Sequence, residues 1–301
     1  MRRDPTVQYL TMDIGGSSIK YALARDNLQL TEKGELPTQY DTHATFVETL
    51  GGVYDRFAGE VDGIALSCCG ELDPATGHMF SGGALTFNAG TNMIESVRAR
   101  CGVPVSVEND ANCALLAEAN SGCLVGCRNA VALIIGTGVG GAILLNGAIY
   151  HGSNFHAGNA SFAKVNLSDP DSASFAITNG VGGLVSDYAE LAGVPAGGMD
   201  GRFVFELVQR GDSTALAALD RFCQRLSAFV FNLQVILDVE AFAIGGGISA
   251  QPVFVDTLRE KVAAVFDGAW IPLPRPQVRA CAYFNDANLI GALHHHLNTH
   301  R

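Results

Sequence analysis

One local pattern occurs twice in this 301-residue chain, once near the start and once near the middle. The stretches "YLTMDIGGSSIKYALARDN" (9–27) and "NAVALIIGTGVGGAILLNGAIYHG" (129–152) each place an apolar strand, a small-residue turn and a second apolar strand in the same order. Asn146-Gly147 predicts a tight hairpin after the second copy. A repeated unit of this kind predicts a duplicated α/β fold with mixed sheets and a cleft between its halves.

Glycine-rich turns follow three of the predicted strands, in "DIGGSS" (13–18), "GTGVGG" (136–141) and "GGGIS" (245–249). Glycine has no Cβ, so its amide can approach an anion closely, and serine and threonine add hydroxyl donors. We therefore expect these turns to hold a nucleotide polyphosphate, although Lys20 is equally explained as a strand surface charge. The candidate nucleotide-binding residues are Gly15, Gly16, Ser17, Ser18, Lys20, Thr137, Gly138, Gly140, Gly246 and Gly247.

Other interpretations of these turns are weaker. Gly136-x-Gly138-x-x-Gly141 formally matches the dinucleotide fingerprint, but that motif should open a helix, whereas the following "AILLNGAIY" predicts a strand. The chain has no GxxxxGK[ST] motif, which excludes a P-loop. Plain β-turns remain an alternative that the shared placement of the three turns disfavours.

Two carboxylates stand where strands are predicted to end. Asp13 directly precedes the first glycine turn, where it either caps the turn or binds Mg²⁺ through its oxygens. In "VSVENDANCALLAEA" (105–119) a strand gives way to a helix, and Asp110 is predicted to be its N-cap or first-turn residue. An ionised Asp110 can accept a proton from an alcohol, and Asn109 can hold hydroxyl groups. Taken alone, the Asn109-Asp110 segment is best explained as a helix-capping sequence. In a chain with three glycine turns suited to binding phosphate, it favours phosphoryl transfer.

Composition narrows the class of protein. Hydrophobic residues make up 48% of the chain, which permits a large core, and the formal net charge of −11 argues against nucleic acid as a partner. No apolar run approaches membrane-spanning length and no signal peptide is evident, so we expect a cytoplasmic protein. The eight cysteines show no zinc spacing and are expected to be reduced thiols. The histidines at 294–296 are interpreted as a solvated helix end.

Five motifs resemble, in the same order, those of the ROK (repressor, open reading frame, kinase) sugar kinases: "MDIGGSSIK", "GIALSCCGELDPATG", "VPVSVENDANCALLAE", "LIIGTGVGGAILLNG" and "FAIGGGIS". The resemblance implies a two-lobed actin-like ATPase (ribonuclease H-like) fold with MgATP in the cleft, and a homodimer. We expect a smaller lobe over residues 1–118, completed by a C-terminal helix at 287–301, and a larger lobe over 119–286.

The resemblance also implies roles for individual residues. Asp110 would be the general base, Asn109 would contact the sugar, and "SGGALTFN" (81–88), with Gly83 and Asn88, would lie beside it. In "FHAGNASF" (155–162), Asn159 and Phe162 stand where the family has a sugar-binding glutamate and histidine. Losing that carboxylate would cost on the order of 1–3 kcal/mol in sugar binding. The 163–183 stretch lacks the family's zinc-binding cysteines, so no structural zinc is expected.

The predicted function is ATP-dependent phosphorylation of a sugar hydroxyl. Absence of the zinc motif and of the histidine resembles the β-glucoside kinase branch. The substrate could then be a hexose, a β-linked disaccharide, an N-acylated amino sugar or an unusual compound. The alternative is a catalytically impaired descendant that binds sugar or nucleotide as a sensor, which Asn159 and Phe162 favour. An actin-like or chaperone-like ATPase acting on protein would not require the Asn109-Asp110 pair.

Overall fold

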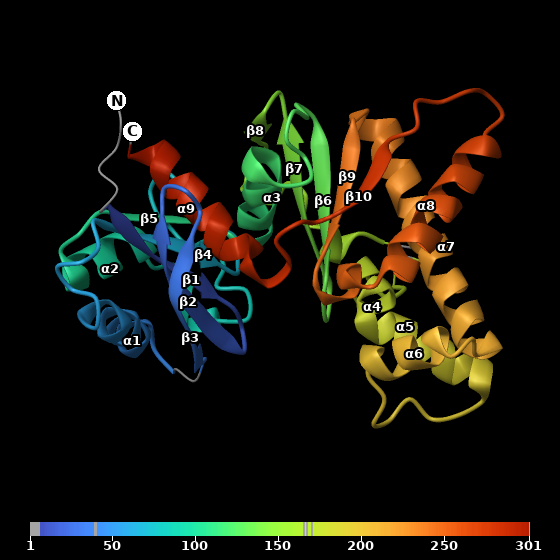
Figure 1. The fold of residues 1–301 in the computed structure, drawn as a ribbon, viewed down its shortest axis with the longest axis horizontal. Helices are drawn as coiled ribbons and strands as arrows, with labels where there is room; N and C mark the ends of the chain where they lie inside the picture. Colours follow the sequence, from blue (N-terminus) through green and yellow to red (C-terminus); the bar gives the residue numbers. More distant parts are fainter. Residues whose placement is uncertain (1–6, 39–40, 165, 167, 170, 301) are drawn as a thin grey trace. The chain divides into compact units, whose positions relative to one another are not determined.

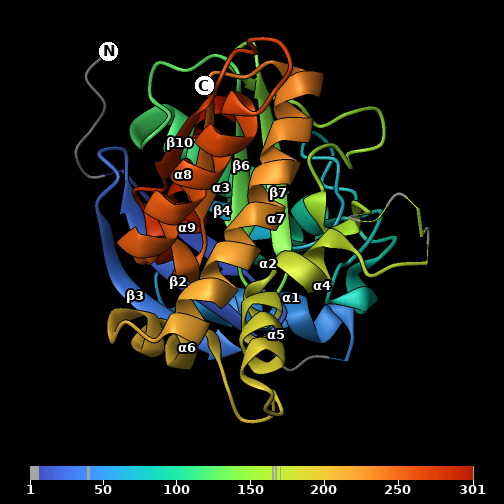
Figure 2. The same cartoon turned by 90° about the vertical axis from the view of Figure 1, so that its right-hand side faces the viewer.

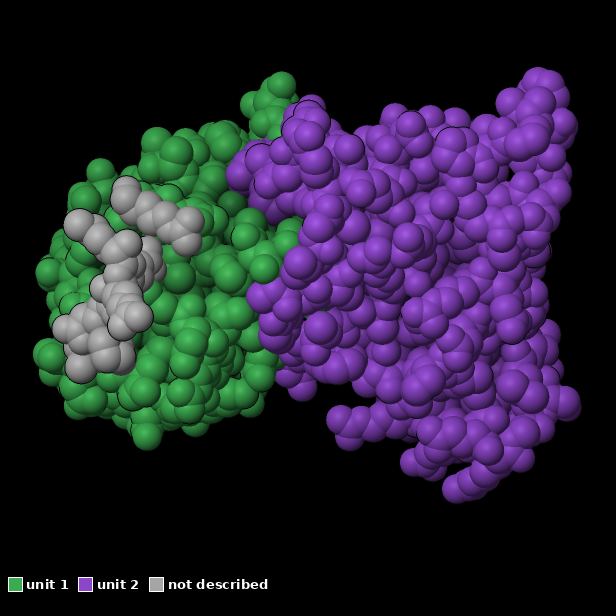
Figure 3. All heavy atoms as spheres, turned by 45° about the horizontal axis from the view of Figure 1, so that its top comes forward, with its two compact units in different colours: residues 1–120, 152–156, 286–301 green, residues 121–151, 157–285 purple. Residues whose placement is uncertain are grey.

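The computed structural model describes residues 7–38, 41–164, 166, 168–169 and 171–300. The chain forms two compact units, coloured separately in Figure 3. Unit 1 comprises residues 1–120, 152–156 and 286–301, and unit 2 comprises residues 121–151 and 157–285. Each unit contains its own five-stranded mixed sheet covered by helices, which confirms the predicted α/β class (Figure 1).

The sheet of unit 1 has the strand order β3-β2-β1-β4-β5. Strand β1 pairs antiparallel with β2 and parallel with β4, so the first glycine turn closes a hairpin and the later strands require crossover helices. The elements of this unit are β1 (Gln8–Ile14), β2 (Ser18–Arg25), β3 (Leu30–Pro37), α1 (His43–Asp55), β4 (Gly63–Cys68), α2 (Met93–Cys101), β5 (Val105–Asn109), α3 (Asp110–Ser121, whose last residue belongs to unit 2) and α9 (Ala287–Thr299).

The two faces of β1 pack against different helices. Leu10, Met12 and Ile14 are fully buried in a core shared with α1 and α2. The alternate residues point to the opposite face, because successive side chains of a strand alternate. That face is covered by α9 (Figure 1). The ring of Tyr9 lies 5.1 Å from that of His296 on this helix. Asp13 therefore projects toward the α9 side of the sheet.

The histidines near the C-terminus do not form a solvated helix end. His296 is 2% exposed, and its Nδ1 lies 2.9 Å from the Ser106 hydroxyl. Burial, together with nearby His300 and His295, lowers the pKa of His296 to about 3, so the ring is neutral. The prediction was wrong because His296 shares the inward face of α9 with the buried Leu293, one turn earlier.

Unit 2 repeats the strand–turn–strand pattern in a sheet of order β10-β9-β6-β7-β8. Helices α7 and α8 pack together over this sheet (Figure 2). Phe222 and Phe254 are buried in the core, with ring centroids 6.1 Å apart. The hairpin at Asn146-Gly147 is confirmed, since both residues have positive φ (55° and 84°). The elements are β6 (Ala130–Ile135), β7 (Val139–Leu145), β8 (Ala148–Ile149), α4 (Phe175–Asn179), α5 (Val181–Ala192), α6 (Gly201–Gln209), α7 (Ser213–Leu237), β9 (Ala241–Gly245), α8 (Pro252–Asp267) and β10 (Gln277–Ala280).

Helix length and composition also bear on membrane association. Among the residues that the structure describes, no helix combines the length and the apolar character needed to cross a bilayer.

Candidate active site

The turn between β5 and α3 carries the candidate base. Strand β5 ends at Asn109 and α3 begins at Asp110, as the sequence predicts. The Asn109 side-chain oxygen accepts the main-chain N–H groups of Ala111 (2.9 Å) and Asn112 (3.3 Å), so Asn109 caps the helix. Asp110 is thus a first-turn residue, and its Oδ1 accepts the Ala111 N–H at 2.8 Å. The helix dipole favours a negative charge at this place.

The electrostatic environment of Asp110 suits a general base. Its pKa is raised from 3.8 to about 6, chiefly because burial removes the carboxylate from water. The negative charge of Asp13 raises it further, whereas the hydrogen bonds from Ala111 and Asn109 lower it. A carboxylate with this pKa is mostly ionised at neutral pH and is still basic enough to take up a proton.

A buried glutamate, Glu108, supports this turn from behind. Its Oε1 accepts the Asn109 main-chain N–H at 2.8 Å and the Asn112 side-chain amide at 3.0 Å. Its Oε2 lies 3.9 Å from Nδ1 of His295, on α9. The Glu108 side chain is only 2% exposed, so these contacts replace the hydrogen bonds that the carboxylate would make with water. Sequence reasoning did not single out Glu108, although it is adjacent to Asn109.

Asp13 is held by residues from two other segments. Its Oδ1 accepts hydrogen bonds from the Ser67 hydroxyl and from the Asn288 amide, both at 2.9 Å. Ser67 lies directly opposite Asp13 on the parallel strand β4, and Asn288 comes from the first turn of α9. Within the described chain, no residue donates a hydrogen bond to Oδ2 of Asp13. That oxygen fits the hard-ligand chemistry of Mg²⁺, either directly or through water.

The first glycine turn closes the β1–β2 hairpin next to the candidate sugar loop. The Gly15 amide donates to the Ser18 carbonyl at 3.0 Å, while Gly16 and Ser17 are exposed at the tip. A Cβ on Gly16 would lie 2.7 Å from the Cβ of Ala84, so only glycine permits this approach. Lys20 stands opposite Asp13 in the hairpin register, which places both side chains on one face of the sheet.

The 70–92 segment connects this turn with Asn109. The Asn109 side-chain amide donates to the Gly70 carbonyl at 3.0 Å. Gly83 is exposed with a φ of 55°, and a Cβ there would lie 3.0 Å from the Gly70 nitrogen. The structure thus brings Asp13, Gly83 and Asn109 into one neighbourhood of unit 1.

Asn88 differs from the other candidate sugar contacts. It is fully buried, and its Oδ1 lies 2.8 Å from Nδ1 of His43, whose Nε2 lies 2.9 Å from the Ser96 hydroxyl. Among the described residues, the Asn88 amide nitrogen has no hydrogen-bond partner. Direct contact with a ligand would require the 81–92 segment to move, and the role of Asn88 as a sugar contact stays a prediction.

In unit 2, the other two glycine turns lie at one edge of the sheet. Strands β6 and β9 are parallel, with Ile134 opposite Gly245, so the turns that follow them emerge side by side. A ligand is commonly bound at such carboxyl ends of parallel strands. Thr137 is exposed and Gly138 partly buried in the first of these turns. Gly140 is part of β7 instead, which also excludes the helix that a dinucleotide fingerprint requires.

The turn after β9 depends on glycine. Gly246 has a φ of 85°, and a Cβ there would lie 2.0 Å from the Ile135 carbonyl oxygen, which no side chain could tolerate. Gly247 is exposed, and a Cβ on it would meet nothing within 4 Å. The first glycine is thus required by the fold, whereas the second leaves its amide open to a ligand.

The residues that depart from the family pattern also lie in unit 2. Asn159 precedes a short 3₁₀ turn at Ala160–Phe162 and is partly buried. Phe162 is 66% exposed, so most of its side chain lies outside the core. The Ser161 hydroxyl between them donates to the Val139 carbonyl at 2.8 Å, which ties this segment to β7.

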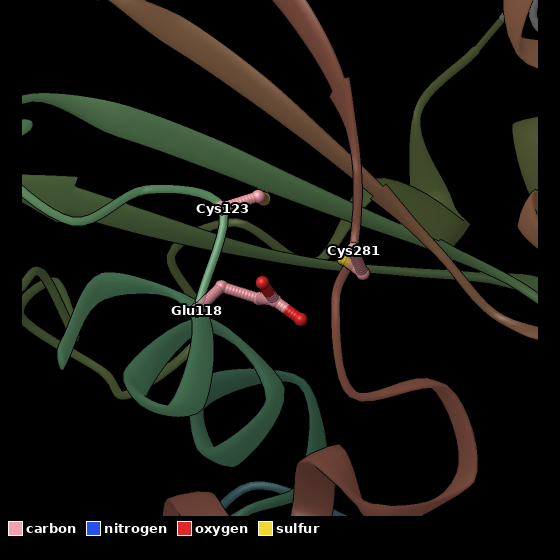
Figure 4. Close-up of side chains that lie close together, drawn as sticks. All are labelled: Glu118, Cys123 and Cys281. Carbon is pink, nitrogen blue, oxygen red and sulfur yellow. The ribbon is translucent and has the colours of Figure 1, made fainter. Parts of the chain in front are cut away.

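All eight cysteines are in the thiol form, as predicted. Cys123 and Cys281, which both belong to unit 2, have sulfur atoms within 4.8 Å of each other; Figure 4 shows them together with Glu118 of α3. Two thiols do not by themselves complete the four-ligand set of a structural zinc ion.

Comparisons with known proteins extend over nearly the whole chain. A family model described as "ROK family" matches residues 9–297. A β-glucoside kinase of Klebsiella pneumoniae is 32% identical over 287 residues, covering 94% of each chain. A β-glucoside kinase of Listeria innocua is 30% identical over 290 residues, covering 95% of this chain and 96% of the relative. The crystal structure of a ROK family protein from Streptococcus pneumoniae in complex with sucrose is 26% identical, has a TM-score of 0.87 and covers 98% of this chain and 99% of that one. The similarity confirms the actin-like ATPase fold.

Proposed function

The chain belongs to the ROK family and is a sugar kinase, and from this premise we propose that it transfers the γ-phosphoryl group of ATP to a hydroxyl of a hexose, a hexose derivative or a β-glucoside. Asp110 serves as the general base in this reaction. The observation that carries the proposal is the position of Asp110, a first-turn carboxylate with a pKa of about 6 in the same neighbourhood as Asp13.

Phosphoryl transfer needs alignment and charge neutralisation more than covalent chemistry. Asp110 takes up the proton of the sugar hydroxyl while the hydroxyl oxygen bonds to the γ-phosphorus. ADP leaves with the electrons of the broken P–O bond. Asn109 supports this step because its carboxamide fixes the start of α3 while retaining a second N–H for a sugar hydroxyl. Gly83 offers main-chain groups beside it.

Asp13 would hold Mg²⁺ through its Oδ2, while Ser67 and Asn288 keep the carboxylate oriented through Oδ1. The cation supplies neutralisation of phosphate charge when bound. The acidic protein has a net charge of −11 and few basic groups to perform this task. The exposed amides of Gly16, Thr137 and Gly247, with the hydroxyls of Ser17 and Ser18, are the proposed phosphate ligands.

The names of the two curated relatives support a β-glucoside as the substrate. The exposed Phe162 offers an apolar face to a sugar where a histidine would donate a hydrogen bond. Asn159 retains donor and acceptor groups but no charge. We further propose that the protein acts in the cytoplasm as a homodimer, which sedimentation of the purified chain would test.

The proposal is tested by ADP release from MgATP with a panel of sugars that includes glucose, cellobiose and 2-acetamido hexoses. Release should depend on sugar and should fall by at least about 10³-fold in Asp110→Asn. Asp256→Asn is the matched control, since that carboxylate is 63% exposed on α8. ADP formed without sugar, or undiminished in Asp110→Asn, would contradict the assignment.

The second candidate function is a sugar or nucleotide sensor, favoured by the neutral Asn159 and by Phe162. Calorimetry distinguishes the two. Sugar binding in the presence of MgATP without any ADP release would establish the sensor and exclude the kinase.

A further inference from the structure

Unit 1 carries a pair of stacked aromatic rings, one of which is exposed. Phe80 is 53% exposed, and its ring lies 5.4 Å from that of Phe155 with an interplanar angle of 16°. The His78 ring packs edge-on against Phe80 at 4.9 Å and 85°. One exposed apolar side chain is ordinary, but an exposed ring supported from two sides is held in a fixed orientation.

The segment that supplies Phe155 is tied to the loop that carries Phe80. Nδ1 of His156 lies 3.3 Å from Oε1 of Glu71. The Glu71 carbonyl accepts the main-chain N–H groups of Phe80 at 2.8 Å and Ser81 at 3.2 Å. Phe155 adopts a left-handed φ of 55°, which a bulky residue takes up only when its surroundings require it. Contacts between segments over 70 residues apart in the chain therefore build this pair of rings.

The aromatic pair lies close to the proposed catalytic residues. Gly70, which accepts the hydrogen bond from the Asn109 side chain, is the residue before Glu71. Glu71 is one Cα–Cα step from Gly70, and its carbonyl accepts the main-chain N–H of Phe80. The Cα atoms of Gly70 and Phe80 are therefore separated by about 9 Å at most. That distance is comparable to the length of a two-ring sugar.

The chemistry of the surface matches one kind of ring. A β-linked glucopyranose carries all its hydroxyls equatorially, so each face of the ring presents C–H groups that pack on an aromatic face. Its hydroxyls point outward from the ring edge and need polar partners, and the two segments that carry the rings also carry a polar pair, Glu71 and His156. An α-linked disaccharide is bent at the glycosidic bond and would not lie flat along the same line.

We propose that Phe80, supported by Phe155, binds the second pyranose ring of a β-linked diglucoside whose other ring is held at Asn109 and Asp110. This inference rests on the proposed kinase function and assigns the specificity of that site to the aromatic pair. Phe80 acts on binding of the second ring and takes no part in proton or phosphoryl transfer.

The experiment compares kcat/KM for cellobiose, maltose and glucose in the full-length protein, using coupled ADP release. The native protein should favour cellobiose over maltose. Phe80→Ala should lower the ratio of the cellobiose value to the glucose value by about 10- to 100-fold, because one face of the second ring loses its partner. Phe80→Tyr should restore most of the ratio, and Trp270→Ala, which removes a ring that is 93% exposed on unit 2, should leave it unchanged.

The outcomes separate this inference from the proposed function. Phosphorylation of glucose with no use of cellobiose, or an unchanged ratio in Phe80→Ala, would overturn the role of Phe80 and leave the kinase intact. No phosphorylation of any sugar would overturn the kinase itself. Circular dichroism and thermal unfolding of each variant show whether it is folded, and Phe80→Tyr tests the same role if Phe80→Ala does not fold.

Discussion

Replacement of Asp110 by asparagine should abolish activity and yet stabilise the folded protein near neutral pH. Burial raises the pKa of Asp110 from 3.8 to about 6, so the folded state binds this proton more tightly than the unfolded chain does. Below pH 3.8 the residue is protonated in both states. As pH rises from 3.8 to about 6, the unfolded chain ionises this carboxyl group while burial still opposes its ionisation in the folded state, so stability is lost over this interval and stays low above it.

The size of the effect follows from the shift. The displacement from 3.8 to about 6 corresponds to ~3 kcal/mol in the free energy of unfolding at neutral pH. Between the two pKa values the penalty is partial, and it amounts to about 1 kcal/mol near pH 4.5. Asparagine keeps an oxygen that can accept the Ala111 N–H, so the substitution removes mainly the charge. The free energy of unfolding of Asp110→Asn, relative to that of the native protein, should thus increase by about 2 kcal/mol from pH 4.5 to 7.5.

Urea unfolding of both proteins over this pH range, without nucleotide and with a chelator present, measures the difference directly. Asp256→Asn, which alters an exposed carboxylate, should show no such growth with pH. In the native enzyme, kcat/KM should rise with pH through an apparent pKa of about 6, because the base must be ionised. A stability difference that stays constant from pH 4.5 to 7.5 would refute the argument that burial opposes ionisation of Asp110.

Three further predictions concern groups around the same site and the turns. Asn288→Ala removes a hydrogen bond to Asp13, so the Mg²⁺ concentration for half-maximal activity should rise several-fold. Asn298→Ala, at an exposed position of the same helix, is the control and should not change that concentration. Gly246→Ala should fail to fold or should lower the free energy of unfolding in urea by several kcal/mol. Gly247→Ala should unfold like the native protein but raise KM for ATP. Equal stabilities of the two variants would contradict the geometry of this turn. Asn109→Asp keeps an acceptor for the helix cap, whereas Asn109→Ala removes it and should lower the free energy of unfolding by about 1 kcal/mol more than Asn109→Asp does. Both variants should raise KM for sugar. Equal unfolding midpoints of the two variants would disprove the cap.

Local patterns in the sequence were sufficient for the elements that carry the site. Apolar runs predicted the strands, glycine after a strand predicted the turns, and "END" predicted the change from β5 to α3 at Asn109 and Asp110. Each of these depends on residues within a few positions of one another, which is why composition and spacing are enough. The resemblance of the motifs then implied the ROK family, which the match over residues 9–297 confirms.

Tertiary packing decided what surrounds those elements. The hydrogen bond from Asn288 to Asp13 joins residues 275 positions apart, and it forms because α9 packs on the face of β1 that carries Asp13. The same packing buries His296, which the sequence alone suggested was solvated. Segment 152–156 joins unit 1 and brings Phe155 onto Phe80. The sequence by itself determined the candidate base and the glycine turns, because both are properties of short segments. Only the fold decided the pKa of the base, the partners of Asp13 and the stacking of Phe155 on Phe80, because burial and long-range contact depend on how distant segments pack.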